Sequence, residues 1–428
     1  MFTDFDFTTL SGKTVAVALS GGSDSMALLY YMLSVKDKFQ FNLVALNVEH
    51  GIRGEASLSD SEFVKEQCKQ LNIPLLSFKV DALSFAKENK LSIEQSARIL
   101  RYNCYKTAIN AGNCHLIATA HHLKDNAETI LLNLFRGTGL KGASGISNFD
   151  GSIIRPFIAT PKEEILSYLN ENAIPFVTDE SNFVDDVTRN NLRLNVLPLI
   201  EKLYPDYQNS LYRFSLIAKE EDEYLDGIAK NHLFFDNDTV KIDTDIDKVI
   251  FKRACILAFK LMGIEKDWEK AHVDASVSLL NLQTGAKINL PKGVTAIKEY
   301  DKIVLYKLDL KKPLSLAFNE QEFSFYNKVY SIKKTDSIAS LKNGFYLDVD
   351  KVAKTAVIRT KKDGDVFTKF GGGTKSLNDY FTDKKIPARL RDSIPIIADG
   401  NKVLAIFGIA ISDLVKVDNS TKTIYQLS

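Results

Sequence analysis

Cysteine is scarce in the 428-residue sequence, and long apolar runs are missing. The four cysteines include no CxxC pair, which excludes a disulfide framework and a zinc or iron–sulfur cage. The longest apolar run covers residues 403–411, well short of the roughly 20 residues needed to cross a bilayer. Asp4 and Asp6 stand where a signal peptide would carry basic residues. We therefore expect a cytoplasmic protein with reduced thiols and no membrane partner.

An overall excess of one charge is also missing, because the formal net charge is only +1. The charge is nevertheless unevenly placed. Residues 351–391 hold eleven basic and four acidic side chains, a local charge of +7, whereas residues 218–247 hold ten acids and three bases. A polyanion such as RNA would be attracted to the first stretch and repelled by the second. The alternative is that both are merely solvated faces.

The first 150 residues alternate apolar runs with helical patterns, which predicts an α/β fold built on a doubly wound parallel sheet. The predicted strands and helices cover residues 14–19, 26–34, 41–48, 58–71, 74–80, 93–111, 115–120 and 124–135. Ligands of such sheets bind beyond the carboxyl ends of the strands. Polar segments follow three predicted strands, at residues 20–25, 49–54 and 121–125, so we expect the functional residues there.

The rest of the chain predicts two further domains. Beyond Pro161 the pattern is helical, and the acidic stretch reads as a linker or a solvated helix. Lys311-Lys312-Pro313 marks a boundary, after which short strands punctuated by Gly and Pro follow. We predict a catalytic domain at residues 1–215, a mixed helical middle domain at 216–310, and a small β-rich α+β domain at 314–428.

The most specific motif is Ser20-Gly21-Gly22-Ser23-Asp24-Ser25, between a predicted strand and a predicted helix. Glycines there let backbone N–H groups wrap an anion at the positive end of the helix. The three hydroxyls can donate to phosphate, and Asp24 can hold Mg²⁺. No Gly-Lys-Ser/Thr follows, so the loop is not a Walker A loop. The alternative is a Gly-rich turn that only caps the helix. The string resembles the pyrophosphate loop (PP-loop) of the N-type ATP pyrophosphatases.

Further motifs narrow the family. They are Glu49-His50-Gly51-Ile52-Arg53; Glu94, Arg98 and Arg101 on one helical face; His121-His122 with Asp125 and Glu128; Arg189 with Arg193; Arg359 to Asp365; and Lys384-Lys385 with Arg391. Their order and spacing resemble the tRNA(Ile)-lysidine synthetase family over nearly the whole chain, least between residues 218 and 310. Two positions depart from the family pattern: Lys124 and Asn126 flank Asp125 where the family usually has a second acid and a Gln.

The resemblance implies that ATP adenylates carbon 2 of the wobble cytidine in the isoleucine tRNA with a CAU anticodon, releasing pyrophosphate. Free L-lysine then attacks that carbon and expels AMP. This ligation changes the codon read from AUG to AUA and the charged amino acid from Met to Ile. It implies ATP and Mg²⁺ as cofactors. Members of the family are often dimers, so a homodimer is a further expected partner.

The implied roles fall into three groups. Asp24 and Asp125 are candidate Mg²⁺ ligands; Asp125 is the first and Glu128 the second candidate for accepting the proton of the lysine amine. His50 and Arg53 are assigned to the adenosine, with capping of a turn as the alternative for His50. Arg98 and Arg101 could clamp phosphate or the lysine carboxylate, although Glu94 and Arg98 could be only a surface ion pair. The expected tRNA contacts are Arg101, Arg189, Arg193, Lys361, Lys362, Lys384, Lys385 and Arg391. For Arg189 and Arg193 a domain interface is the alternative.

Two other functions use the same kind of fold. A tRNA thiolase would need catalytic cysteines, whereas Cys104 and Cys114 are ten residues apart and Cys104 falls inside a predicted helix. An RNA-binding module that only senses nucleotide would not need Asp24 and Asp125. Lysine-dependent AMP release indicates lysidine synthesis, sulfur-dependent release a thiolase, and no release a binding protein.

Overall fold

The computed structural model describes residues 3–52, 55–177, 187–236, 238–265, 267–307, 313–326, 328–335 and 344–428. The chain divides into two compact units, Met1–Leu225 and Asp226–Ser428. The finer division into three domains at residues 215 and 310 stays a prediction. Within the described residues, no helix is both long and apolar enough to cross a membrane.

The first unit is built on a six-stranded sheet of order β3-β2-β1-β4-β6-β5, in which every pairing except β5 with β6 is parallel. The strands are β1 (Thr14–Leu19), β2 (Asn42–Glu49), β3 (Leu75–Lys79), β4 (Leu116–Ala118), β5 (Phe149–Asp150) and β6 (Ile153–Ile154). From β1 the chain winds outward through β2 to β3, then returns to the other side of β1 with β4. The strand order therefore reverses between β1 and β4, which is where doubly wound sheets bind ligands.

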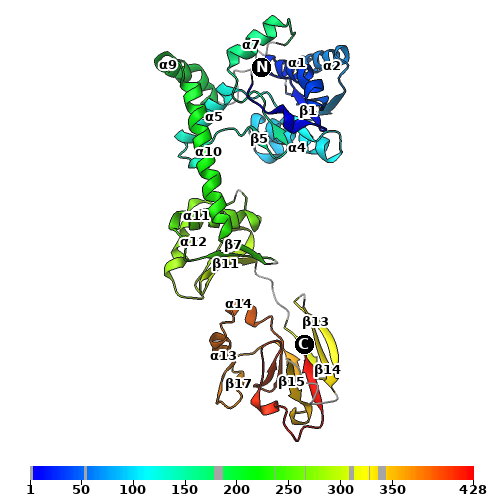
Figure 1. The fold of residues 1–428 in the computed structure, drawn as a ribbon, viewed down its shortest axis with the longest axis vertical. Helices are drawn as coiled ribbons and strands as arrows, with labels where there is room; N and C mark the ends of the chain where they lie inside the picture. The colour runs from blue at the N-terminus through cyan, green and yellow to red at the C-terminus, as the bar shows by residue number, and fades with distance from the viewer. Residues whose placement is uncertain are drawn as a thin grey trace. The chain divides into compact units, whose positions relative to one another are not determined.

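Helices cover both faces of this sheet (Figure 1). They are α1 (Ser23–Phe39), α2 (Glu55–Gln70), α3 (Ala82–Asn89), α4 (Ile93–Asn110), α5 (Leu123–Phe135), α6 (Leu140–Ala143) and α7 (Lys162–Glu171). Val15 and Val17 of β1 pack with α1 and α7 in one core, while Ala16 packs with Tyr105 of α4 in another. Because successive residues of a strand point to opposite faces, a strand buried on both sides reads as a continuous apolar run. The predicted doubly wound α/β fold is confirmed.

A helical segment follows the sheet and packs against α5. It comprises α8 (Val187–Asn191), the π-helix η2 (Leu192–Val196), α9 (Leu197–Leu203) and α10 (Tyr207–Asn231). Leu192, Leu197 and Tyr207 form a small core with Ala127 and Leu132 of α5. Figure 1 shows α10 as one long helix, which carries the first half of the acidic stretch; Glu220, Glu221 and Glu223 are exposed on it. The prediction of a solvated acidic helix is confirmed for residues 218–231.

The second unit begins with the last residues of α10, which are followed by a five-stranded antiparallel sheet of order β7-β8-β11-β10-β9. Its elements are β7 (Leu233–Asp236), β8 (Thr239–Asp243), β9 (Lys287–Asn289), β10 (Val294–Glu299), β11 (Lys302–Lys307), α11 (Lys248–Leu261) and α12 (Lys270–Ser278). Phe251, Cys255 and Phe259 of α11 are fully buried at a spacing of four residues, as one apolar helix face requires. The predicted mixture of helices and short strands is confirmed.

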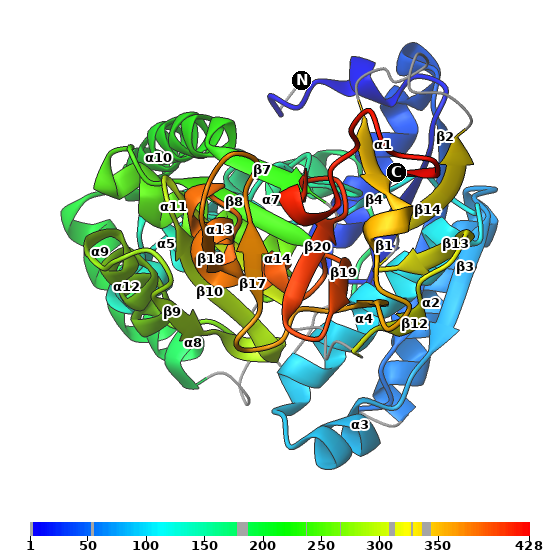
Figure 2. The same cartoon turned by 90° about the horizontal axis from the view of Figure 1, so that it is seen from below.

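The remaining residues of the second unit form two β-sheets. One contains β12 (Ser315–Ala317), β16 (Val357–Arg359), β17 (Val366–Thr368), β18 (Thr374–Ser376), β19 (Ile396–Asp399), β20 (Lys402–Ile406) and β21 (Ala410–Ile411). The other contains β13 (Gln321–Phe325), β14 (Lys328–Thr335), β15 (Phe345–Asp348) and β22 (Ile424–Leu427). Figure 2 shows β19 beside β20. The short helices α13 (Leu377–Asp383) and α14 (Ala388–Arg391) accompany the first sheet. Ile332 and Leu347 share a core with Ile358 and Ile397, so side chains of both sheets pack together.

Candidate active site

The phosphate loop connects β1 to α1 and folds back on its own serines. Gly21 has a φ of +88°, a left-handed conformation that favours glycine, and Gly22 caps the N-terminus of α1. Ser25 Oγ accepts the N–H of Ser20 at 3.2 Å and donates to the Gly22 carbonyl at 3.0 Å. The loop therefore surrounds the positive end of a 17-residue helix, which is a suitable place for an anion.

Asp24, in the first turn of α1, is paired with a lysine from a distant segment. The Lys162 ammonium contacts the Asp24 carboxylate and donates to Ser23 Oγ at 3.0 Å. Lys162 is the first residue of α7, where the helix dipole disfavours a cation. Sequence reasoning missed Lys162. The one available signal was that a lysine in the first turn of a helix is disfavoured by the helix dipole, which suggests that its side chain binds a group outside that helix.

The second carboxylate of the site follows β4. Asp125 lies in the first turn of α5, and one of its oxygens accepts the backbone N–H of His122 at 3.1 Å. His122 Nε2 lies 3.4 Å from Asp125 Oδ2 and 3.8 Å from Asp24 Oδ2. Burial acts to raise the pKa of Asp125, but His122, His121 and the backbone hydrogen bond outweigh it and lower that pKa. Two carboxylates thus flank one imidazole at the place where the strand order reverses.

The third acid of this group, Glu128, is fully buried, and both of its carboxylate oxygens accept hydrogen bonds from arginines. It accepts hydrogen bonds from Arg189 Nε at 3.0 Å and from Arg193 Nε and Nη2 at 2.7 and 2.9 Å. Asp125 Oδ1 also lies 3.8 Å from Arg189 Nη2 and 3.6 Å from Arg193 Nη2. These bonds tie α8 and η2 to α5 and favour the interface alternative for both arginines; their contact with tRNA stays a prediction. They also make Asp125 the better candidate for the lysine amine.

Two histidines near the strand ends are held neutral. Burial, followed by the field of Arg101, lowers the pKa of His50 to about 4, and burial with Arg155 and Arg98 lowers that of His121 to about 4. Within the described residues, His50 Nδ1 is buried without a hydrogen-bond partner. The turn after β2 is held instead by Glu49, which accepts the Gly51 N–H at 2.8 Å. Capping of this turn by the His50 side chain is therefore not observed.

Helix α4 presents the two predicted arginines toward these histidines. Arg98 and Arg101 are exposed, and the Arg98 guanidinium lies 5.3 Å from the centre of the Tyr102 ring. No ion pair joins Glu94 to Arg98 in the part of the chain that the structure describes. Both guanidinium groups are thus available to an anion. Arg53, the other predicted nucleotide contact, lies outside the described residues.

The departure at Asn126 has a structural explanation. Asn126 is buried, and its Oδ1 accepts the Ile146 N–H at 2.7 Å, which fixes the loop after α6. Gly145 has a φ of +67° and lies so close to the Asn126 amide that a Cβ would collide with it. The Asn126 amide therefore has a structural role in holding this loop. Nothing in the structure explains Lys124.

The cysteines do not fit a thiolase site. Cys68, Cys104, Cys114 and Cys255 are all buried, and burial raises the pKa of each thiol. A thiol with a raised pKa is a poor nucleophile and a poor metal ligand at neutral pH. Among the described residues, no three His, Cys, Asp or Glu side chains converge as a metal cage would require.

The predicted tRNA contacts of the C-terminal region differ in availability. Arg359 and Asp365 form a buried ion pair with bonds of 2.8 and 2.7 Å, which anchors the turn that carries two of the lysines. Lys361 pairs with Asp392 at 3.2 Å, and Arg391 donates to the Ile386 carbonyl at 3.0 Å. Three predicted contacts are exposed and form no ion pair with a described carboxylate: Lys362, Lys384 and Lys385.

Comparison with known proteins agrees with this geometry. Residues 4–200 match the model of the PP-loop domain, and residues 356–427 match that of the TilS substrate C-terminal domain. The tRNA(Ile)-lysidine synthase of Caldanaerobacter subterraneus subsp. tengcongensis is 33% identical over 96% of this chain and 92% of its own length. That of Clostridium acetobutylicum is 32% identical over 96% of this chain and 94% of its own.

A solved structure, the U34-tRNA thiolase NcsA from Methanococcus maripaludis, matches 49% of this chain and 73% of its own at 18% identity and a TM-score of 0.43. The identity and coverage of the curated relatives are what decide the family. The chain belongs to the tRNA(Ile)-lysidine synthase family.

Proposed function

We propose that this chain is a cytoplasmic ligase that joins free L-lysine to carbon 2 of the wobble cytidine in the CAU-anticodon isoleucine tRNA, using ATP. The observation that carries the proposal is the pair of carboxylates, Asp24 and Asp125, on either side of His122 beside the phosphate loop. One acid belongs to the loop that would hold departing pyrophosphate, and the other lies in the first turn of α5, after β4, where it could accept a proton from an attacking amine.

The adenylation step needs groups that hold phosphate and its charge. The loop at residues 20–25 offers serine hydroxyls and the positive end of α1. Mg²⁺ fits here, since it is usually held by one or two carboxylates plus substrate phosphates, and Asp24 and Asp125 would supply two carboxylates on either side of His122. When bound, the ion would neutralise charge that develops on the phosphates. Lys162 would exchange Asp24 for a phosphate oxygen, because its ammonium already lies on the loop.

The transfer step needs an ionised carboxylate whose two oxygens are not both held by guanidinium groups. The lowered pKa of Asp125 keeps it ionised at neutral pH, so it can attract the lysine ammonium. The same shift makes it a weaker base, and its assignment as the acceptor of the amine proton rests on its place beside the phosphate loop. Glu128 is less suited, because two guanidinium groups occupy its oxygens. Arg98 and Arg101 are exposed and can bind the lysine carboxylate or a phosphate through two parallel hydrogen bonds.

The tRNA is expected to contact both units. The wobble base lies in a single-stranded loop and can enter a pocket without opening a duplex. The basic residues of the C-terminal region would contact the backbone at positions away from the anticodon. Such contacts are needed, since the anticodon alone does not separate this tRNA from the methionine tRNA that shares it. A homodimer stays a prediction that a mass measurement in solution tests.

The function is tested with labelled ATP, tRNA(Ile) transcript and lysine. We expect AMP release that depends on lysine, and a nucleoside product whose mass is that of lysidine. Asp24→Ala should abolish AMP and pyrophosphate formation while tRNA affinity stays within a few fold. Asp37→Ala, on the same helix and 92% exposed, is the matched control and should behave as the parent. AMP release that depends on a sulfur donor, or no release at all, would contradict the proposal.

Asp125→Asn separates the two roles of that residue. An amide cannot accept the amine proton, so lysine transfer should be impaired at least as much as adenylation. Transfer is measured by supplying preformed adenylated tRNA and following lysine incorporation. Normal transfer combined with lost adenylation would make Asp125 a metal ligand and remove it as the proton acceptor.

A further inference from the structure

A cavity of about 810 Å³ opens in the C-terminal region, far along the chain from the residues of the candidate active site. Strand β15, the turn after β17, helix α13 and the segment after β21 contribute its walls. Aromatic rings and lysines dominate the lining, which includes Tyr346, Phe367, Phe370, Tyr380, Lys369 and Lys384. Pockets that bind a small ligand have this range of volume.

The aromatic rings are arranged as a floor and a rim. Phe367 and Tyr380 are buried, with ring centres 4.5 Å apart, and form the floor. Phe370, in contrast, is 60% exposed, although it lines the same cavity. The Tyr346 ring lies so close to Gly344 that a Cβ on residue 344 would come within 2.9 Å of the ring. A larger residue than glycine at position 344 would therefore displace the Tyr346 ring. An exposed ring at the rim of a cavity offers a flat face to a ligand.

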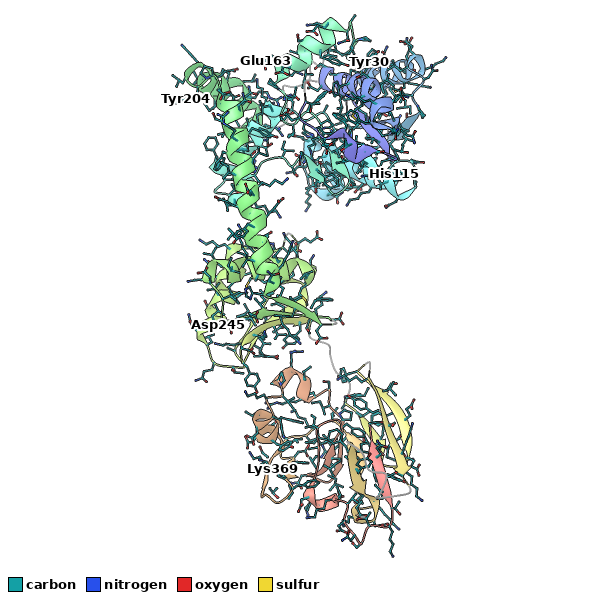
Figure 3. All side chains as sticks on the ribbon, viewed as in Figure 1. Tyr30, His115, Glu163, Tyr204, Asp245 and Lys369 are labelled. Atoms are coloured by element: carbon teal, nitrogen blue, oxygen red, sulfur yellow. The ribbon has the colours of Figure 1, made fainter. Side chains whose placement is uncertain are left out.

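The charges around the cavity are mainly positive. Lys369, labelled in Figure 3, and Lys384 each lie 5.9 Å from the centre of the Tyr380 ring, and Lys416 also lines the cavity. Among the described residues, Asp383 is the one carboxylate in the lining, and it is bound by Lys375 and by Lys369, the latter at 3.4 Å. Lys416 pairs with Asp413 at 3.0 Å, so Lys384 is the lining lysine that forms no ion pair with a described carboxylate. A ligand with a flat ring and a negative charge would complement this lining.

We propose that this cavity binds one unpaired nucleotide of the tRNA, with its base against Phe370 and its phosphate near Lys384. The inference rests on the proposed function only in taking tRNA as the ligand. Base–aromatic stacking with nearby cations is how proteins bind single-stranded RNA. A paired base cannot enter, because its faces are covered by its neighbours in the stack. The C-terminal region would therefore contact the tRNA at a single-stranded position, not only along a duplex.

The test uses the full-length protein and two labelled probes, a single-stranded RNA pentanucleotide and a blunt RNA duplex without unpaired nucleotides. We expect Phe370→Leu to weaken binding of the pentanucleotide and of tRNA at least about fivefold, while binding of the duplex is unchanged. Phe370→Tyr keeps the ring and should stay within about twofold of the parent. Phe149→Leu, which removes a 51% exposed ring in the first unit, is the matched control and should have no effect.

Three results would overturn the cavity proposal: equal affinity of the parent and Phe370→Leu for the pentanucleotide, an equal loss for the duplex, or an acidic peptide that binds the parent and is not displaced by the pentanucleotide. Unfolding curves of the variants verify that each is folded, and Lys384→Gln gives a second, milder change that should weaken the same probe. Lysine-dependent AMP release by the parent is measured separately. Its absence would defeat the proposed function, whereas its presence with unchanged Phe370→Leu binding would defeat the cavity alone.

Discussion

Replacing Glu128 by Gln tests whether Arg189 and Arg193 hold the active site together or contact tRNA. The carboxylate is fully buried, whereas the two guanidinium groups are 27% and 33% exposed. Removing one partner of a buried ion pair costs about 3–5 kcal/mol, and hydration of the partly exposed arginines should reduce this to about 2–3 kcal/mol. For a unit of this size that loss corresponds to a fall of about 5–10 °C in the unfolding midpoint.

The assay is a double-mutant cycle of Glu128→Gln and Arg193→Gln, measured by the unfolding midpoint and by tRNA affinity at several salt concentrations. If Arg193 binds Glu128, the double variant should be about as unstable as either single variant. Glu164→Gln on α7, which removes an exposed acid, is the control and should leave the midpoint unchanged. The salt dependence of tRNA binding should also be unchanged in Arg193→Gln.

Additive losses of stability would refute this reasoning, because side chains in contact give non-additive effects. A salt dependence that flattens by about one unit for Arg193→Gln would show a phosphate contact instead. The salt-dependence result would make tRNA binding the main role of this arginine.

Three further outcomes are expected. Gly145→Ala should destabilise the first unit by about 2 kcal/mol or more, measured by denaturant unfolding. The control is Gly151→Ala, because Gly151 has a similar φ of +61° but a Cβ there would meet open space. Equal losses of stability in the two variants would contradict the role of Asn126. The pKa values of His50 and His121 are about 4 in the folded protein and near 6.5 in the unfolded chain, so the free energy of unfolding should be constant above pH 6.5 and fall between pH 6.5 and 4 by up to about 1.4 kcal/mol per pH unit for each ring. In a pH series of unfolding midpoints, His50→Gln should show a smaller fall than the parent. An equal fall in the variant and the parent would contradict this prediction. Neutralising four lysines together should weaken tRNA binding and leave ATP affinity unchanged. The slope of log affinity against log salt concentration should flatten by about three units, because one of the four lysines is already paired with Asp392. Equal slopes and equal affinities for the variant and the parent would contradict the assignment of these lysines to tRNA. The four are Lys361, Lys362, Lys384 and Lys385.

The sheet and the positions of its strand-end residues could be predicted from sequence because they depend on local patterns. The run from Val15 to Leu19 is apolar throughout, and the strand covers it together with Thr14. The segment after it carries glycines and serines that cannot continue a strand. Asp24 and Asp125 each follow a parallel strand by a few residues. Parallel strands end at one edge of a sheet, so the approach of these acids to one another follows from topology.

The contacts that complete the site could not be predicted, because each joins segments far apart in the chain. Lys162 reaches Asp24 across 138 residues, and Arg193 reaches Glu128 across 65. No local pattern distinguishes an arginine that binds a buried carboxylate from one that binds a phosphate. The same holds for Arg359 and Asp365, which read as part of a basic RNA-binding stretch and instead form a buried pair.

The charges of the site are balanced in a way that bears on how a nucleotide enters it. Three acids on the strand-end helices, Asp24, Asp125 and Glu128, are paired with cations from segments that follow later in the chain. An incoming polyphosphate would compete with these carboxylates for the same cations. Asp24 gives up its cation most readily, since its side chain is 33% exposed and Lys162 is its ion-pair partner, whereas Glu128 is fully buried and doubly bound. Nucleotide binding should therefore rearrange the pair at the phosphate loop and leave the Glu128 cluster intact as the fixed support of Asp125.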